Sequence, residues 1–115
     1  MLVFLKAKTG MKTLSNRIKE ARLRSGLSQE RLGLEIGLEP ESASTRMNRY
    51  ERGTRTPDLG LIERLAHQLD LPVAYFYSAS DDEAELLQLF HRLDEAARRQ
   101  VVLFAIELAT PSPDG

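Results

Sequence analysis

Cysteine is absent from this 115-residue sequence, and histidine occurs only at positions 67 and 91. The lack of cysteine excludes disulfides, thiolate metal sites, iron–sulfur clusters and a cysteine nucleophile. Two imidazoles are too few for a histidine-rich metal centre. No run of about 18 uninterrupted apolar residues is present, which excludes a membrane-spanning helix, and the apolar stretch at residues 2–5 is too short for a signal peptide. We therefore expect a cytoplasmic protein with no metal site and no membrane anchor.

Motifs that are typical of enzymes are also missing. The sequence contains no phosphate-binding glycine-rich loop, no nucleophile elbow and no histidine–glutamate metal motif. His67 and His91 have no partner at metal-ligand spacing. Glu51 lies next to Arg52 and near Arg55, so we expect an ion-pair partner rather than a catalytic carboxylate. The sequence predicts no catalytic residue and no cofactor.

The net charge of −1 hides a division along the chain. Residues 11–57 carry ten cationic side chains and six anionic ones, whereas residues 58–115 carry four cationic and eleven anionic ones. This asymmetry suggests that the first half faces a polyanion and that the second half has another role.

Apolar periodicity predicts an all-α fold. Ser28, Asp58 and Asp94 stand where N-caps are expected, and Gly26 and Gly53 follow predicted helix ends. Gly33 falls inside a predicted helix, where a close approach by a neighbouring helix would explain its presence. The helices are predicted over residues 14–25, 28–36, 42–51, 58–69, 72–77, 82–92 and 95–109.

These helices define three parts of the chain. Residues 1–12 form an N-terminal arm, residues 13–78 form a five-helix domain, and residues 82–109 form a C-terminal helical hairpin. The polar stretch 78–82 between the last two parts is predicted to be a hinge.

Two short helices joined by a turn, inside a basic five-helix unit, are the arrangement of a DNA-binding helix-turn-helix. Several separated motifs then resemble the phage Cro/repressor-like family, also called the XRE family. They are Leu27-Ser28-Gln29-Glu30-Arg31-Leu32, Gly37, Tyr50-Glu51-Arg52-Gly53 and Thr56-Pro57-Asp58-Leu59. The resemblance covers about residues 12–77 and implies a five-helix repressor-like domain that binds double-stranded DNA.

The predicted recognition helix carries the base-contacting candidates. Met47 and Tyr50 are predicted to point inward, which turns the opposite side chains toward the major groove. The candidates are Ser44, Thr45, Arg46, Asn48 and Arg49. Arg49 is the first choice for reading a base, while Arg46 suits a base or a phosphate equally. The turn at residues 38–42 is longer than in most family members. The sequence therefore fixes the start of the recognition helix, and its first groove-facing residue, only to within about one helical turn.

Phosphate contacts are expected on either side of the recognition helix. Gln29 stands where family members bind a backbone phosphate, and four arginines are weaker candidates. These arginines are Arg17, Arg22, Arg52 and Arg55.

The predicted helix at residues 95–109 is apolar around most of its circumference, so it must be buried on more than one side. We expect the C-terminal hairpin to pair with its copy in a second subunit. The dimerisation residues are Val101, Phe104, Ala105, Ile106 and Leu108. Packing on the fourth and fifth helices of the same chain, or binding of a different protein, are the alternatives.

Together these features predict a transcriptional regulator that binds a palindromic operator as a homodimer. Repression is the mode that the resemblance implies more often, and activation stays open. The alternative is an antitoxin-like or adaptor protein that binds a partner through residues 82–109 and for which DNA binding is secondary.

Overall fold

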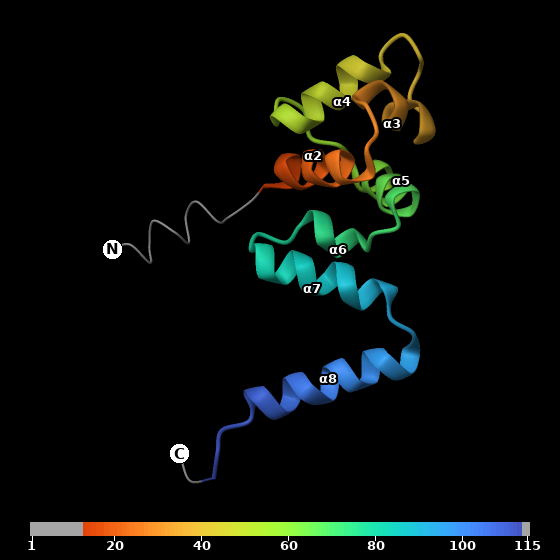
Figure 1. Ribbon diagram of the computed structural model, residues 1–115. Coiled ribbons are helices and arrows are strands. Elements are labelled where there is room, and N and C mark those ends of the chain that lie inside the picture. The colour runs from red at the N-terminus through yellow and green to blue at the C-terminus, as the bar shows by residue number, and fades with distance from the viewer. Residues whose placement is uncertain (1–12, 114–115) are drawn as a thin grey trace, which may run out of the picture.

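The structure, a computed structural model, describes residues 13–113, and every regular element within that range is a helix (Figure 1). The N-terminal arm predicted at residues 1–12 lies outside the described residues. The helices are α2 (Leu14–Ser25), α3 (Gln29–Glu35), α4 (Ala43–Arg52), α5 (Leu59–Leu69), α6 (Val73–Phe76), α7 (Asp81–Arg92) and α8 (Glu95–Ala109). The all-α prediction is confirmed, and so is the order of the helices.

The predicted caps explain where three of the helices begin. Ser28, Asp58 and Asp94 each accept a hydrogen bond from the backbone N–H three residues later, at 3.0, 2.8 and 2.8 Å. Each bond satisfies one of the backbone donors that a helix start leaves free. Gly26 and Gly53 end α2 and α4 in the left-handed conformation, with φ of 75° and 77°.

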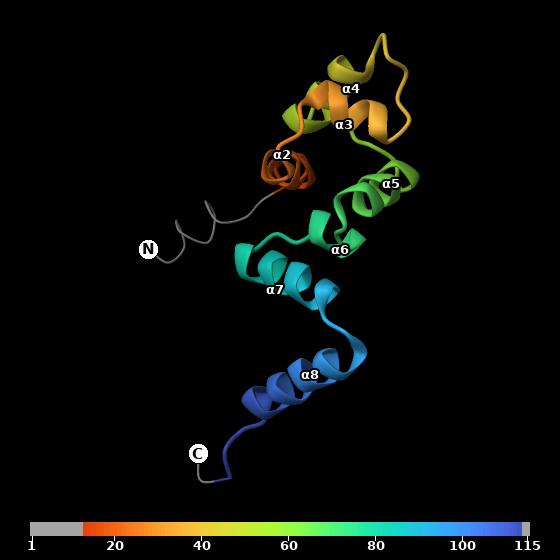
Figure 2. The same ribbon diagram turned by 45° about the vertical axis from the view of Figure 1, so that its right-hand side comes forward.

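The core lies among α2, α3, α4, α5 and α6, which are stacked at one end of the molecule (Figures 1 and 2). Its fully buried side chains are large and apolar. They include Ile18, Leu32, Met47, Ile62, Leu65, Tyr75 and Phe76. This apolar centre fixes α3 and α4 relative to the rest of the domain.

α3 and α4 approach each other most closely at Gly33. A Cβ placed at Gly33 would lie 2.9 Å from the Cβ of Ala43 and 3.0 Å from its carbonyl oxygen. Any side chain at this position would therefore push the two helices apart. The close approach predicted from the glycine is present, and it sets the angle of the helix-turn-helix.

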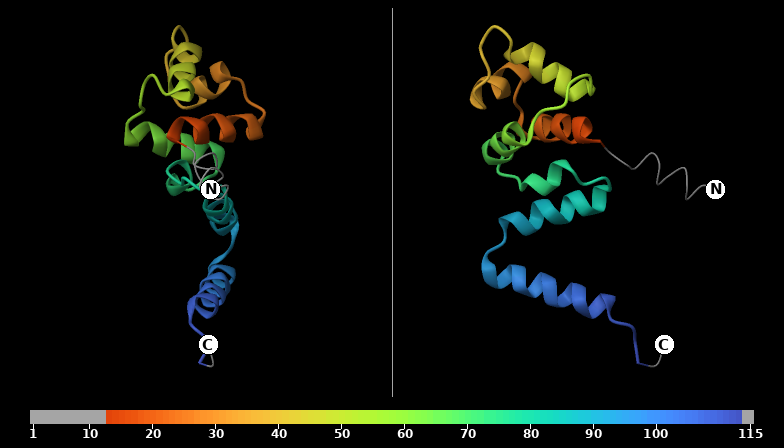
Figure 3. Two further views of the ribbon diagram at one scale, coloured as in Figure 1. Left: turned by 90° about the vertical axis from the view of Figure 1, so that its left-hand side faces the viewer. Right: turned by 180° about the vertical axis from the view of Figure 1, so that it is seen from behind.

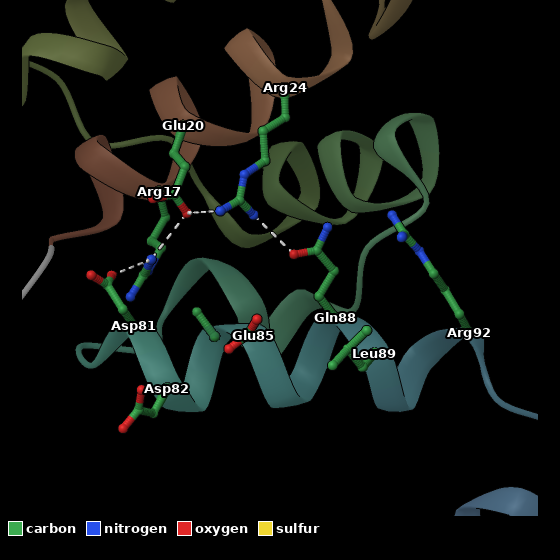
Figure 4. A pocket seen from close by; sticks show the side chains of 10 residues that line it. Arg17, Glu20, Arg24, Asp81, Asp82, Glu85, Gln88, Leu89 and Arg92 are labelled. Atoms are coloured by element: carbon green, nitrogen blue, oxygen red, sulfur yellow. Dashed lines mark hydrogen bonds and ion pairs between the residues drawn. The ribbon is translucent and has the colours of Figure 1, made fainter.

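The stretch between α6 and α7, predicted to be a hinge, is bound by Arg17 of α2. Arg17 is 1% exposed, and its guanidinium donates to the carbonyl oxygens of Ser78 and Ser80, both at 2.9 Å. The guanidinium also lies 3.1 Å from the carboxylate of Asp81 and 3.0 Å from that of Glu20 (Figure 4). A hinge prediction from polar composition could not anticipate this, because the side chain that fixes the backbone lies 61 residues away.

Further polar contacts tie α7 to the domain. Arg24 donates to the side-chain oxygen of Gln88 at 2.9 Å, and Ala84 on the same helix is buried. Tyr75 donates its hydroxyl hydrogen to Glu20. Burial and then this hydrogen bond raise the pKa of Tyr75 to about 12. α7 is therefore part of the packed body rather than a loose appendage.

α8 differs from every other helix because none of its residues is buried. It lies beyond α7, at the end of the molecule opposite α3 and α4, in all the views (Figures 1, 2 and 3). The alternative of packing on the same chain is therefore not observed for α8, whereas α7, the other helix of the predicted hairpin, does pack on the fifth helix, α6. Within residues 13–113, no helix is long and apolar enough to span a bilayer.

Candidate nucleic-acid interface

α4 presents one side to the core and the other to solvent. Ala43 and Met47 are fully buried, and Tyr50 is nearly so, which confirms the prediction that Met47 and Tyr50 point inward. The extra residues of the long turn stay outside the helix, since α4 begins at Ala43. Ser44 is therefore the first exposed residue of α4, and the open register of the recognition helix is fixed.

The outward side of α4 carries the side chains proposed from the sequence. Ser44, Thr45 and Arg49 are exposed, while Arg46 and Asn48 are partly buried along the edges. Arg46 leans across Tyr50, with its guanidinium 5.8 Å from the ring centre and donating to the hydroxyl at 2.8 Å. This contact with Tyr50 holds the Arg46 side chain at the edge of α4, between its buried and its exposed side.

A buried carboxylate fixes the orientation of α4. The side chain of Glu51 is 2% exposed and accepts two hydrogen bonds from Arg22 of α2, at 2.6 and 3.0 Å. Arg22 also donates to the carbonyl oxygen of Leu27 at 2.9 Å. This pairing of one arginine with two oxygens restrains both distance and rotation between α2 and α4.

Gln29 adds the link between α3 and α4. Its amide nitrogen donates to Glu51 at 3.1 Å and to the side-chain oxygen of Asn48 at 3.3 Å. Both amide hydrogens are thus used inside the protein.

The expected phosphate contacts separate into two groups. The guanidinium groups of Arg17 and Arg22 are engaged inside the protein, so neither is presented to a ligand. Arg52 and Arg55 are exposed at the end of α4 and in the turn that follows. Within the described part of the chain, neither of them pairs with a carboxylate.

Three arginines gather beside the exposed end of α4. Arg46, Arg49 and Arg55 line a hollow of about 280 Å³ together with Ser42 and Tyr50. Guanidinium groups with no acidic partner, arranged around a concave surface, favour an anionic ligand. Adjacent exposed donors on α4 make a continuous polar surface suited to a nucleic-acid groove.

The ion-pair partner of Glu51 differs from the residues predicted from the sequence. Glu51 pairs with Arg22, 29 residues earlier, and not with the neighbouring Arg52 or Arg55. The sequence signal was weak, because any of several basic residues on the first helix could have faced α4. Burial of Glu51 follows from its position one residue after Tyr50 on the inner side.

Comparison with known proteins agrees with this geometry. A family model described as helix-turn-helix matches residues 18–76, which span α2 to α6 apart from the first turn of α2. The chain belongs to the XRE family of helix-turn-helix proteins. The resemblance predicted from the sequence motifs is thus confirmed.

A solved structure extends the similarity of this helix-turn-helix protein beyond the family match. The transcriptional regulator BswR shares 38% sequence identity with the chain, and the two superpose with a TM-score of 0.75. The similarity covers 81% of this chain and 92% of that one, so it includes part of the C-terminal region. None of the curated protein sequences compared with the chain matches it.

Proposed function

We propose that this helix-turn-helix protein is a transcriptional regulator that binds a palindromic operator in duplex DNA. The observation that carries the proposal is the exposed polar side of α4, held rigidly by the buried contact between Arg22 and Glu51. A base-reading helix needs such support, because small errors in its orientation misplace every donor in the groove. The similarity to BswR supports the regulatory role.

We assign each side chain to a base or a phosphate according to its exposure to solvent. Arg49 reads a base, most readily guanine through two parallel hydrogen bonds, with Ser44, Thr45 and Asn48 beside it. Arg46 lies at the flank, where it reaches either a base edge or a phosphate. Arg52 and Arg55 contact phosphates. Gln29, Arg17 and Arg22 are left out of the contact set, because their donors are already used within the protein.

The test begins with selection of bound duplexes from a random pool. An enriched palindrome is expected, with half-sites one helical turn or a whole number of turns apart. On that duplex, Arg49→Ala should cost about 1–3 kcal/mol and relax the preference at one base of each half-site. Arg52→Ala should weaken binding to all sequences alike. Arg92→Ala, an exposed arginine at the end of α7 and outside α4, is the matched control and should bind as the parent does.

The salt dependence of affinity separates phosphate contacts from base contacts. Each neutralised phosphate contributes about −0.9 to the slope of log affinity against log salt concentration. Arg52→Ala and Arg55→Ala should therefore flatten the slope, while Arg49→Ala should leave it nearly unchanged. Equal flattening by all three variants would contradict the proposed assignment of Arg49 to a base.

We further propose that the protein acts as a homodimer held together by α8. A single helix-turn-helix covers only a half-site, and two copies multiply the discrimination. The dimerisation residues proposed are Val101, Phe104, Ala105, Ile106 and Leu108, all of them exposed or partly exposed. Sedimentation of the parent chain and of Ile106→Asp tests this, because a charge in the interface should split the dimer.

Repression is the proposed mode of action, by occupation of an operator that overlaps a promoter. This target would place the protein with the chromosome in the cytoplasm. A reporter under the selected operator should lose expression when the chain is produced and regain it with Arg49→Ala. The unburied apolar surface of α8 also favours one second candidate, an adaptor that binds another protein there. A monomeric chain that enriches no palindrome would support the adaptor.

A further inference from the structure

The apolar surface that the body leaves unburied is concentrated in two helices. Seven of the eleven large apolar side chains that are exposed within residues 13–113 belong to α7 or α8. They are Leu86, Leu89, Val102, Leu103, Phe104, Ile106 and Leu108. Scattered exposed leucines need no explanation, but a cluster on adjacent elements marks an interaction surface.

α8 carries apolar side chains on two opposite sides. Val101, Phe104 and Leu108 share one side at helical spacing, while Val102, Ile106 and Ala109 occupy the other. In residues 101–109, Glu107 is the only polar residue. A pairing of α8 with its copy alone would cover one of these sides and leave the other in water.

α7 has an apolar outer side as well. Ala84 faces the body and is buried, whereas Leu86 and Leu89 lie on the opposite side of the helix and are each 53% exposed. Figures 1 and 3 place this outer side of α7 toward α8. The surface that is missing a partner therefore consists of α7 and both sides of α8.

The elbow between the two helices keeps α8 from closing onto its own α7. Arg98 donates to the carbonyl oxygens of Phe90 and His91 at 2.9 and 2.8 Å, and its guanidinium lies 5.2 Å from the centre of the Phe90 ring. These contacts fix the direction in which α8 leaves α7. From this elbow the helices diverge, so the all-apolar end of α8 is the end farthest from α7 (Figure 1).

We propose that two copies of the chain interlock, so that α8 of each copy lies between α7 and α8 of the other. The four helices are then layered in the order α7, partner α8, α8, partner α7. One apolar side of α8 packs on the partner's α8, and the opposite side packs on the partner's α7. This inference rests on the homodimer proposed above and specifies which surfaces form it.

The available area favours this arrangement over a one-sided contact. An aromatic side chain offers about 150–250 Å², and the six aliphatic side chains of this set are smaller. With 37–70% of each side chain exposed, the seven leave roughly 600 Å² of apolar surface per chain. Stable interfaces bury about 800 Å² per partner. A contact through one side of α8 would use less than half of that surface, whereas interlocking uses α7 and both sides of α8.

Because the sequence contains no cysteine, single introduced cysteines report unambiguously on proximity. Leu89→Cys in a tagged chain and Ile106→Cys in an untagged chain are mixed, and then treated with a short bis-maleimide that joins two thiols. Interlocking predicts a covalent pair of one tagged and one untagged chain, several-fold above the control. The matched control replaces Leu89→Cys by Leu59→Cys, an exposed leucine on α5. The pair Leu86→Cys and Val102→Cys repeats the test at a second contact.

The doubly substituted chain, with Leu89→Cys and Ile106→Cys together, distinguishes exchange from closure within one chain. Interlocking predicts that it becomes a covalent dimer, and a product of single-chain mass would overturn the inference. Phe104→Cys alone reports contact between the two copies of α8. A dimer that is joined through Phe104→Cys but not through the α7–α8 pairs would overturn the interlocked arrangement and leave the proposed homodimer intact. A chain that sediments as a monomer and gives no covalent dimer would overturn both.

Discussion

The packed body, residues 13–92, and α8 contain the same kinds of side chain in opposite environments. Phe76 is fully buried in the body, whereas Phe104 on α8 is 61% exposed, and Leu65 and Leu108 differ in the same way. Both regions form well-capped helices, so local signals do not account for the difference. What separates them is whether the chain itself supplies a facing surface. The body buries a core of its own, whereas we propose that α8 finds its facing surface in a second copy of the chain.

The polar groups show a parallel contrast. In the body, buried charges meet partners from distant segments, as Glu51 meets Arg22. On α8 the polar contacts are local, and Arg98 bonds to the backbone seven and eight residues earlier. The segments of the body are therefore joined by long-range contacts, which we expect to break together on unfolding. Substitutions in α8 leave these contacts intact. We therefore expect substitutions in the body to destabilise the dilute chain more than substitutions in α8.

A large loss of stability is expected from Arg22→Met. This change leaves the carboxylate of Glu51, 2% exposed, without its cationic partner, and breaking a buried pair in this way costs about 3–5 kcal/mol. Urea unfolding followed by circular dichroism measures the change. Arg31→Met is the control, because Arg31 pairs with Glu35 at 3.0 Å but is 66% exposed, so its loss should cost about 0.5 kcal/mol or less. Equal losses in the two variants would contradict the role given to burial.

A smaller loss is expected from Gly33→Ala. The added methyl group would sit 2.9 Å from the Cβ of Ala43, and the forced separation of α3 and α4 should cost about 1–3 kcal/mol. Gly60→Ala in α5 is the matched control, since its new methyl group meets nothing closer than 3.5 Å. It should raise stability by about 0.5–1 kcal/mol through helix propensity. Thermal unfolding of both variants would show opposite signs, and a neutral Gly33→Ala would mean that the helices can separate without cost.

Most of the secondary structure could be predicted from the sequence, because its signals are local. Each helix start predicted at Ser28, Asp58 and Asp94 depends on a bond to the backbone N–H only three residues later. The spacing of apolar residues in α5 likewise predicts its buried side. Local signals could not predict that Arg17, from another helix, binds the backbone of residues 78–82, the stretch predicted to be a hinge. Composition describes only the segment itself, whereas this contact comes from 61 residues earlier in the chain.

The candidate interface divides in the same way. The outward side of α4 followed from helical spacing once Met47 and Tyr50 were placed inward. Which of the nearby arginines are free for DNA did not follow, because that depends on which ones meet acceptors inside the fold. Arg17 and Arg22 were indistinguishable from Arg52 and Arg55 by sequence. Pairing with Glu20, Asp81 and Glu51 is a property of the packed molecule.

The two aspartate caps allow the body and α8 to be compared by one identical change. Asp58 and Asp94 accept the same hydrogen bond at the same distance, 2.8 Å, at the starts of α5 and α8. Removing such a cap costs its helix about 1 kcal/mol. Asp58→Ala should therefore lower the global unfolding free energy by about that amount. Asp94→Ala should leave global unfolding of the dilute chain unchanged and increase hydrogen exchange in the first turn of α8. A global loss from both variants would show that α8 unfolds together with the body.

Only a small effect on the dilute chain is expected from Phe104→Ala, although the same substitution in the body would be severe. Phe76→Ala should cost about 3–5 kcal/mol, because it opens a cavity among buried side chains. Phe104 is 61% exposed within one chain, so its loss should change unfolding of the monomer by about 0.5 kcal/mol or less. At concentrations where chains pair, the parent should gain thermal stability as concentration rises, because only the folded state associates. Phe104→Ala should weaken this dependence on concentration. Unfolding curves across a wide range of concentrations measure both effects together. A large loss for Phe104→Ala at the lowest concentration would mean that α8 is already packed within the single chain.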